Sequence, residues 1–263
     1  MPSSASMLHW VERLQSEGRY AFTRTQAVTD TGRSAVAVQH ALRRLKEKGR
    51  VVSPRSGFYV VVPPEYRAAG SPPASWFIHD LMRHLAQPYY VGLLSAAAIH
   101  GAAHQQPMVF QVVTDRSTRE VCVGRVAIRF SMSSRLSQMP VVLKQTETGT
   151  MRVSTPEATA FDLVRYQSAA GHLSNVATVL SELVERIDAE VLASICPVVS
   201  LPDVQRLGYL LEAIGASEVA APLAGWLKSY SPRAVALRPG EPAHGDVDRR
   251  WRVLPNEPLE IEA

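Results

Sequence analysis

The spacing of apolar residues over the first 50 positions predicts three helices. Residues 7–14 place apolar side chains at helical intervals, which predicts a first helix that ends near Gly18. Thr23-Arg24-Thr25-Gln26 has the form of a capping box at the start of a short second helix through Val28. Asp30-Thr31-Gly32 then predicts a turn, because glycine adopts the positive φ that such a corner needs.

The third helix is predicted from about Ser34 to Lys48, with Gly49 as its stop. Its apolar stripe consists of Val38, Ala41, Leu42 and Leu45. The opposite face carries small, basic and amide side chains: Arg33, Val36, Ala37, His40, Arg43 and Arg44, with Gln39 on the flank. Small side chains permit close approach to a duplex, and the polar ones can reach base edges or phosphates in a major groove.

Two short apolar runs, 50–53 and 58–62, surround the turn Pro54-Arg55-Ser56-Gly57 and predict a β-hairpin. A hairpin directly after a helix pair of this kind is typical of a winged helix-turn-helix, with Arg55 at the tip of the wing. The charge distribution points the same way. The first 60 residues carry ten Lys and Arg against four Asp and Glu, whereas the rest of the chain carries 18 against 20. A basic module on a near-neutral body is the expected footprint of phosphate binding.

We therefore expect the N-terminal segment to bind DNA, and the alternative is a winged helix that contacts protein. The expected DNA-binding residues lie on the second and third helices and the wing. They are Arg24, Arg33, Ser34, Gln39, His40, Arg43, Arg44 and Arg55.

The fold class predicted from the whole chain is α+β, with the winged helix-turn-helix followed by a larger mixed sheet-and-helix domain. We expect residues 1–62 to form the DNA-binding domain and 63–73 a Pro-rich linker. Residues 74–230 would be the α+β domain and 231–263 a Pro- and Gly-rich tail that Trp251 could anchor.

The larger domain is predicted to hold a sheet in its middle with helices around it. Residues 121–130 alternate as one strand, and its likelier core face holds Cys122, Gly124, Val126, Ile128 and Phe130. Further strands are expected at 108–113, 141–146 and 150–154, the last two as a hairpin. Helices are expected at 75–86, 91–102, 155–167, 173–184, 188–195, 201–214 and 216–229.

The chemistry of the sequence argues against an enzyme. It lacks Gly-x-Gly-x-x-Gly, a Walker A loop, Cys-x-x-Cys and Gly-x-Ser-x-Gly, so we expect neither cofactor nor metal. A nuclease would need a cluster of carboxylates near a lysine, and Lys144 and Glu147 are the only nearby candidates. No membrane span or signal peptide is expected, and Cys122 and Cys196 are interpreted as buried thiols in a reducing cytoplasm.

Two segments resemble the AbiEi family of antitoxins. They are Tyr-Tyr-Val-Gly-Leu-Leu-Ser-Ala-Ala-Ala-Ile-His-Gly-Ala at 89–102, followed by Phe-Gln-Val-Val at 110–113, and Ser-Thr-Pro-Glu-Ala-Thr-Ala-Phe-Asp-Leu-Val at 154–164. The resemblance covers roughly residues 5–230 and places the winged helix where the family has it.

This resemblance implies a bacterial toxin–antitoxin pair with a role in phage defence. The N-terminal domain would bind inverted repeats in its own promoter and repress the operon. The C-terminal domain would counteract a nucleotidyltransferase-like toxin, and the resemblance leaves open whether the two proteins touch. The alternative is a winged-helix regulator whose larger domain senses a ligand or mediates assembly without a toxin partner.

Overall fold

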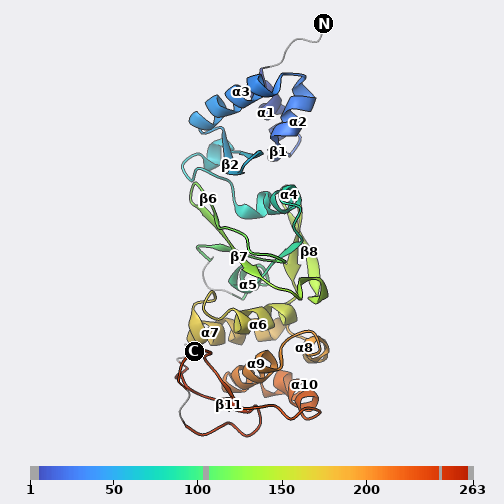
Figure 1. The fold of residues 1–263 in the computed structure, drawn as a ribbon, viewed down its shortest axis with the longest axis vertical. Helices are drawn as coiled ribbons and strands as arrows, with labels where there is room; N and C mark the ends of the chain where they lie inside the picture. The colour runs from blue at the N-terminus through green and yellow to red at the C-terminus, as the bar shows by residue number, and fades with distance from the viewer. Residues whose placement is uncertain (1–5, 103–106, 243–244, 260–263) are drawn as a thin grey trace.

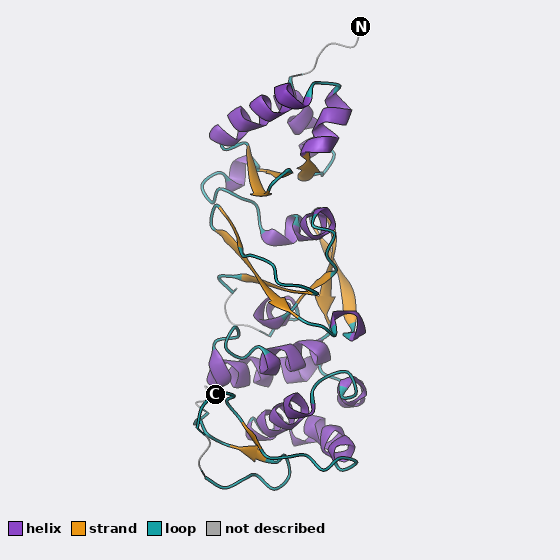
Figure 2. Cartoon of the chain, viewed as in Figure 1, coloured by secondary structure: helices purple, strands orange, loops and turns teal. Residues whose placement is uncertain are grey.

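The computed structural model describes residues 6–102, 107–242 and 245–259. The molecule is elongated: the N-terminal helices lie at one end, a β-sheet occupies the middle, and a bundle of helices with the C-terminal tail forms the other end (Figures 1 and 2). The fold is α+β, as predicted. No helix in the described part of the chain is both long enough and apolar enough to cross a bilayer.

The N-terminal end is a winged helix-turn-helix. Its helices are α1 (Met7–Ser16), α2 (Arg24–Thr31) and α3 (Ala35–Glu47), and its strands are β1 (Ala21–Thr23), β2 (Val51–Arg55) and β3 (Phe58–Val61). The strands form an antiparallel sheet in the order β1-β3-β2. β2 continues through Pro54 and Arg55, so the turn of the wing is shorter than predicted and consists of Ser56 and Gly57, whose φ is 75°.

Local capping starts α2 and α3 where the sequence predicts them, but α2 continues past Val28 to Thr31, so the predicted turn is reduced to Gly32 and Arg33. Thr23 Oγ1 accepts a hydrogen bond from the backbone N–H of Gln26 at 3.1 Å, as a helix N-cap does. Gly32 ends α2 in the left-handed conformation, with φ of 64°. Below α3, the apolar stripe of Val38, Ala41, Leu42 and Leu45 is buried, as predicted. Burial of this stripe leaves the opposite face of α3 toward solvent.

The segment after the wing packs against both parts of the molecule. It contains two short 3₁₀ helices, η1 (Pro64–Tyr66) and η2 (Ala74–Trp76), and its Ser71 and Pro72 are buried. Trp76 meets the ring of Tyr20 edge-on, with ring centroids 4.8 Å apart. Phe58 of β3 belongs to the same buried apolar cluster as Phe77. The winged helix and the central sheet are therefore joined through a continuous apolar core.

The central sheet has six strands in the order β6-β7-β5-β4-β9-β8. Their bounds are β4 (Tyr89–Val91), β5 (Phe110–Thr114), β6 (Val121–Val123), β7 (Val126–Met132), β8 (Val141–Thr146) and β9 (Gly149–Ser154). β5 pairs with β7 and β4 with β9 in parallel, and the other neighbours are antiparallel. Tyr90 and Val113 belong to the core shared with the C-terminal helices. Val91 and Val112 belong to the core shared with α4 (Ile78–His84).

Two predictions for this region are wrong. The helix expected at 91–102 is shorter, α5 (Leu93–Ile99), and the strand β4 precedes it. The single strand expected at 121–130 is the hairpin β6–β7, because Gly124, with φ of 54°, turns the chain back. The turn shifts the alternation, so Val121 and Val123 are buried and Cys122 is exposed. Cys122 is therefore not the buried thiol that we expected, whereas Cys196 is buried.

The helices after β9 lie close to their predicted positions. They are α6 (Pro156–Arg165), α7 (His172–Leu183), α8 (Ala189–Ile195), α9 (Leu201–Ala213) and α10 (Ser217–Leu227). Thr155 caps α6 and Pro156 occupies its first position, as predicted. In the tail, β10 (Val235–Ala236) pairs in parallel with β11 (Val253–Leu254). The fully buried Trp251 anchors this tail, as expected.

Candidate nucleic-acid interface

The solvent-facing side of α3 carries the residues predicted to contact DNA. Gln39, His40, Arg43 and Arg44 are all exposed, and so is Val36, at 64 %. The structure therefore brings four of the eight predicted residues together on one helix face. A face of this composition offers amide, imidazole and guanidinium donors around small or apolar contacts, which is what base edges and phosphates can accept.

The other residues predicted around the helix pair lie at its ends and turn. Ser34 caps α3, and its Oγ accepts a hydrogen bond from the backbone N–H of Ala37 at 3.2 Å. Arg24 is exposed at the first position of α2, and its backbone N–H donates to the carbonyl oxygen of Gly57 at 2.8 Å. Arg33 is half-buried in the turn between the two helices. Ser34 thus has a structural role at the position from which a DNA contact was expected.

The charges on the exposed face of α3 are weakly paired. Arg43 Nε lies 3.3 Å from Glu47 Oε1, and the two side chains are 73 % and 62 % exposed. An exposed ion pair one helical turn apart stabilises a protein by only about 0–1 kcal/mol. A phosphate at this face can therefore compete with Glu47 for the guanidinium of Arg43.

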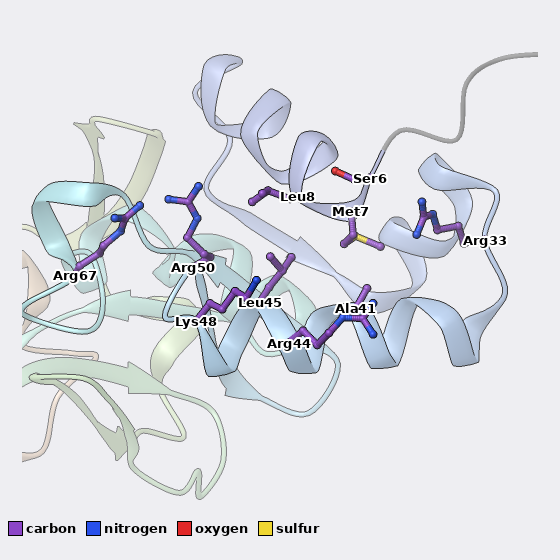
Figure 3. Close-up of a pocket in the computed structure, with 10 residues that line it drawn as sticks. All are labelled: Ser6, Met7, Leu8, Arg33, Ala41, Arg44, Leu45, Lys48, Arg50 and Arg67. Atoms are coloured by element: carbon purple, nitrogen blue, oxygen red, sulfur yellow. The ribbon is translucent and has the colours of Figure 1, made fainter.

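A basic groove of about 460 Å³ lies beside α3, between this helix and the start of α1. Its cationic lining residues are Arg33, Arg44, Lys48, Arg50 and Arg67, and no acidic side chain in the part of the chain that the structure describes lines it. Figure 3 shows Arg44 and Lys48 on α3, with Arg33 toward one end of the groove and Arg67 toward the other. Concave surfaces lined by one sign of charge concentrate counterions, so this groove is suited to a phosphate group.

Three of these groove residues were not among those predicted from sequence. Lys48 follows the last turn of α3 and Arg50 precedes the wing, so their closeness in sequence to Arg44 is a signal that could have found them. Arg67 follows η1, outside the winged-helix motif, and only the folded chain brings it to the groove. Arg50 also pairs with Glu12 of α1 at 3.1 Å.

The side chain of Arg55, at the wing, is bound to the segment before β6. Its guanidinium donates hydrogen bonds to the carbonyl oxygens of Arg119 and Glu120, the latter at 3.4 Å, just before β6. Burial and the nearby Arg119 lower the pKa of Arg55. At the same tip, the ring Nε2 of His84 hydrogen-bonds with the carbonyl oxygen of Ser56 at 3.0 Å. The wing tip is thus fastened to the body of the molecule.

The two segments that carry the family resemblance meet inside the molecule. Val91 of β4 pairs with Val153 of β9, and Tyr90 donates its hydroxyl hydrogen to Asp162 Oδ1 at 3.2 Å. Asp162 is buried, and its Oδ2 has no hydrogen-bond partner among the described residues. A Cβ at Gly92 would approach that oxygen to 2.9 Å, so a glycine is needed there. These distinctive residues therefore build the core.

The family of this core region follows from its sequence. Residues 90–213 match the family model for the AbiEi antitoxin C-terminal domain. This segment is similar to AbiEi antitoxin C-terminal domains. It extends from Tyr90 in β4 through α9 and includes all but the first residue of the two segments that carried the resemblance. The resemblance is thereby confirmed for residues 90–213, and its extension over the winged helix stays a prediction. The AbiEi domain supports an antitoxin role in a toxin–antitoxin system.

A comparison with solved structures supports the fold over nearly the whole chain. A crystal structure of the RV2827C protein from Mycobacterium tuberculosis superposes with a TM-score of 0.65 and 18% sequence identity. The match covers 96% of this chain and 91% of that one. No curated protein matches the chain in sequence. Among the described residues, no group of three or more His, Cys, Asp or Glu side chains is placed to hold a metal ion.

Proposed function

We propose that this AbiEi antitoxin binds inverted repeats in its own promoter through α3 and represses its operon. In the same proposal, it counteracts a nucleotidyltransferase-like toxin in the cytoplasm as part of phage defence, without a cofactor. The observation that carries the DNA-binding part is the exposed face of α3 beside a groove that, among the described residues, is lined by five cations and no acid.

The proposed docking places α3 in the major groove. Gln39 and His40 would face base edges, where amide and imidazole groups discriminate between base pairs. Arg43 and Arg44 would reach the phosphates along the groove, and the basic groove of Lys48 and Arg67 would receive a flanking phosphate. Arg55 has no part in this docking because its guanidinium is bound to the body.

Replacing Arg43 and Arg44 together by alanine should weaken promoter binding several-fold or more. The slope of log K against log salt should also become less steep by about two. The reason is that each phosphate contact releases about one counterion on binding, and the variant lacks two such contacts. Fluorescence anisotropy with the chain's own promoter fragment, at several salt concentrations, measures both quantities. A control variant, Arg116→Ala with Arg125→Ala, removes the same charge from the loop after β5 and from the β6–β7 turn, and it should bind as the wild type does. Equal affinity of the α3 variant and the wild type for the promoter would contradict the proposed docking of α3.

Variants of the groove provide an internal comparison in the same assay. Lys48→Ala with Arg67→Ala should weaken binding to a promoter duplex and to a scrambled duplex by the same factor, because phosphate contacts carry no sequence information. Gln39→Ala should instead reduce the preference for the promoter. If the groove variant changed the preference and Gln39→Ala did not, the assignment of the two surfaces would be reversed.

Antitoxin activity should survive the loss of DNA binding, because the AbiEi domain lies outside the winged helix. The nucleotidyltransferase-like reading frame next to this gene would be expressed from an inducible promoter, with the wild-type chain or the Arg43→Ala/Arg44→Ala variant supplied separately. Growth should be rescued equally by both. Absence of such a neighbouring frame, or failure of both proteins to rescue, would favour a regulator without a toxin partner.

A further inference from the structure

A second basic groove lies at the far end of the molecule from α3. It has a volume of about 700 Å³ and lies between α10 and the turn before β11. Ala221, Ala224 and Gly225 of α10 contribute small residues to its lining. Its charged lining residues are Lys228, Arg249, Arg250 and Arg252, and no carboxylate of the described residues lines it. The volume falls within the range of about 300–1,000 Å³ that is usual for small-molecule sites.

The turn that carries these arginines is built by a local hydrogen-bond network. Asp248 Oδ1 accepts from the backbone N–H groups of Arg250 and Trp251, at 3.0 and 2.7 Å. The backbone N–H of Arg252 donates to the carbonyl oxygen of Asp248 at 2.9 Å. These bonds hold Arg252 at a φ of 56°, a conformation that a residue with a side chain rarely adopts. The turn therefore presents its arginines from a defined backbone.

Three of the four cations are free to meet a ligand. Arg250 is paired with Glu212 at 2.5 Å, which fastens the turn to α9. Lys228, Arg249 and Arg252 are exposed, and no acid in the described part of the chain forms an ion pair with them. Three unneutralised cations around one concave surface form a strong site for a compact anion.

An aromatic side chain completes the groove. Tyr230 lines it and is 47% exposed, and its ring lies against that of Trp226 with centroids 4.3 Å apart. An exposed ring beside guanidinium groups suits a ligand with a planar base and phosphates, because bases stack on aromatic side chains. The carboxylates of an acidic peptide could pair with the arginines but would not stack on the ring of Tyr230.

We propose that this groove, formed by α10, Tyr230 and the 248–252 turn, binds a phosphorylated nucleotide unit. Arg249, Arg252 and Lys228 hold the phosphates, and Tyr230 stacks on the base. The unit is either a free nucleoside polyphosphate or the phosphorylated end of a single-stranded nucleic acid. This site is independent of the duplex-binding surface on α3, and it lies outside the segment matched by the AbiEi family model.

The test uses the full chain and two fluorescent probes, a mant-labelled nucleoside triphosphate and a short 5′-phosphorylated single-stranded RNA. We expect the wild type to bind at least one probe, and the stronger of the two identifies the source of the nucleotide. Arg249→Gln with Arg252→Gln should weaken binding about tenfold, because charge-assisted hydrogen bonds to phosphate are lost. Tyr230→Ala should weaken the binding of both probes several-fold. The affinity for inorganic tripolyphosphate, measured by competition, should be unchanged because tripolyphosphate has no base that could stack on Tyr230.

A charge control separates this site from general attraction to a basic protein. Arg116→Gln with Arg125→Gln removes the same charge elsewhere and should bind both probes as the wild type does. Thermal unfolding checks that each variant is folded. The proposal is overturned if the wild type binds neither probe, or if the charge control loses as much affinity as the groove variant. It is also overturned if poly-glutamate displaces the probes as well as tripolyphosphate does and Tyr230→Ala has no effect.

Discussion

Replacing Trp251 by alanine is expected to lower the free energy of unfolding by about 3–5 kcal/mol, the usual cost of truncating a large buried aromatic side chain. Trp251 has no exposed surface, and its ring Nε1 donates to Glu212 Oε2 at 2.7 Å. The ring also packs directly over Gly208 of α9, where a side chain would overlap it. Urea denaturation followed by circular dichroism at constant pH measures the loss.

The contact between Trp251 and Gly208 can be isolated by a double-mutant cycle. Gly208→Ala alone should be destabilising because its methyl group would collide with the Trp251 ring. In the Trp251→Ala background, the same substitution should be stabilising, because alanine favours a helix over glycine by about 1 kcal/mol. Gly225→Ala in α10 is the matched control, since nothing lies within 4 Å of a Cβ there, and it should stabilise both backgrounds. Additive effects of Trp251→Ala and Gly208→Ala would show that the two positions do not interact.

The elements predicted correctly are those whose signals are local. α3 is a surface helix, so its buried stripe repeats with the helical period and its exposed face is what remains. The start of α6 was predicted from Thr155 and Pro156 because capping acts over three residues. β4 was missed because Tyr89, Tyr90 and Val91 are all buried, and a short apolar run without alternation does not distinguish a strand from a helix. The β6–β7 turn was missed because only one glycine marks it.

In the candidate site, too, the residues that share a local pattern were predicted and those positioned by tertiary contacts were not. Gln39, His40, Arg43 and Arg44 were found because they share a face of one helix. The position of Arg55 depends on Arg119 and Glu120, more than 60 residues later in the chain, and no local pattern encodes that contact. Arg67 reaches the groove beside α3 only through the fold of the segment after the wing. Tertiary contacts therefore determine which of the basic residues near the winged helix are available to the proposed DNA interface.

Removing the carboxyl group of Asp162 should make the protein more stable at neutral and alkaline pH. Burial raises the pKa of Asp162 to about 7, although the hydroxyl of Tyr90 and the nearby Arg165 act to lower it. The folded protein therefore binds a proton at this site between about pH 4 and pH 7 that the unfolded chain releases, so stability falls as pH rises through that range. Asp162→Asn keeps an oxygen acceptor for Tyr90 but cannot ionise, and it should not show this loss.

The difference in the free energy of unfolding between the wild type and Asp162→Asn isolates the contribution of Asp162 from that of every other titrating group. It should be near zero below pH 4 and should grow to at most about 4 kcal/mol in favour of Asp162→Asn at pH 8, given about 1.4 kcal/mol for each pKa unit. Urea denaturation at a series of pH values measures it. Tyr90→Phe removes the hydrogen bond that favours the carboxylate, and it should move the end of the wild-type decline to higher pH. Parallel stability curves for the wild type and Asp162→Asn would mean that the pKa of Asp162 is the same in the folded and unfolded protein. The buried, unpartnered Oδ2 beside Gly92 would then have to be solvated in solution.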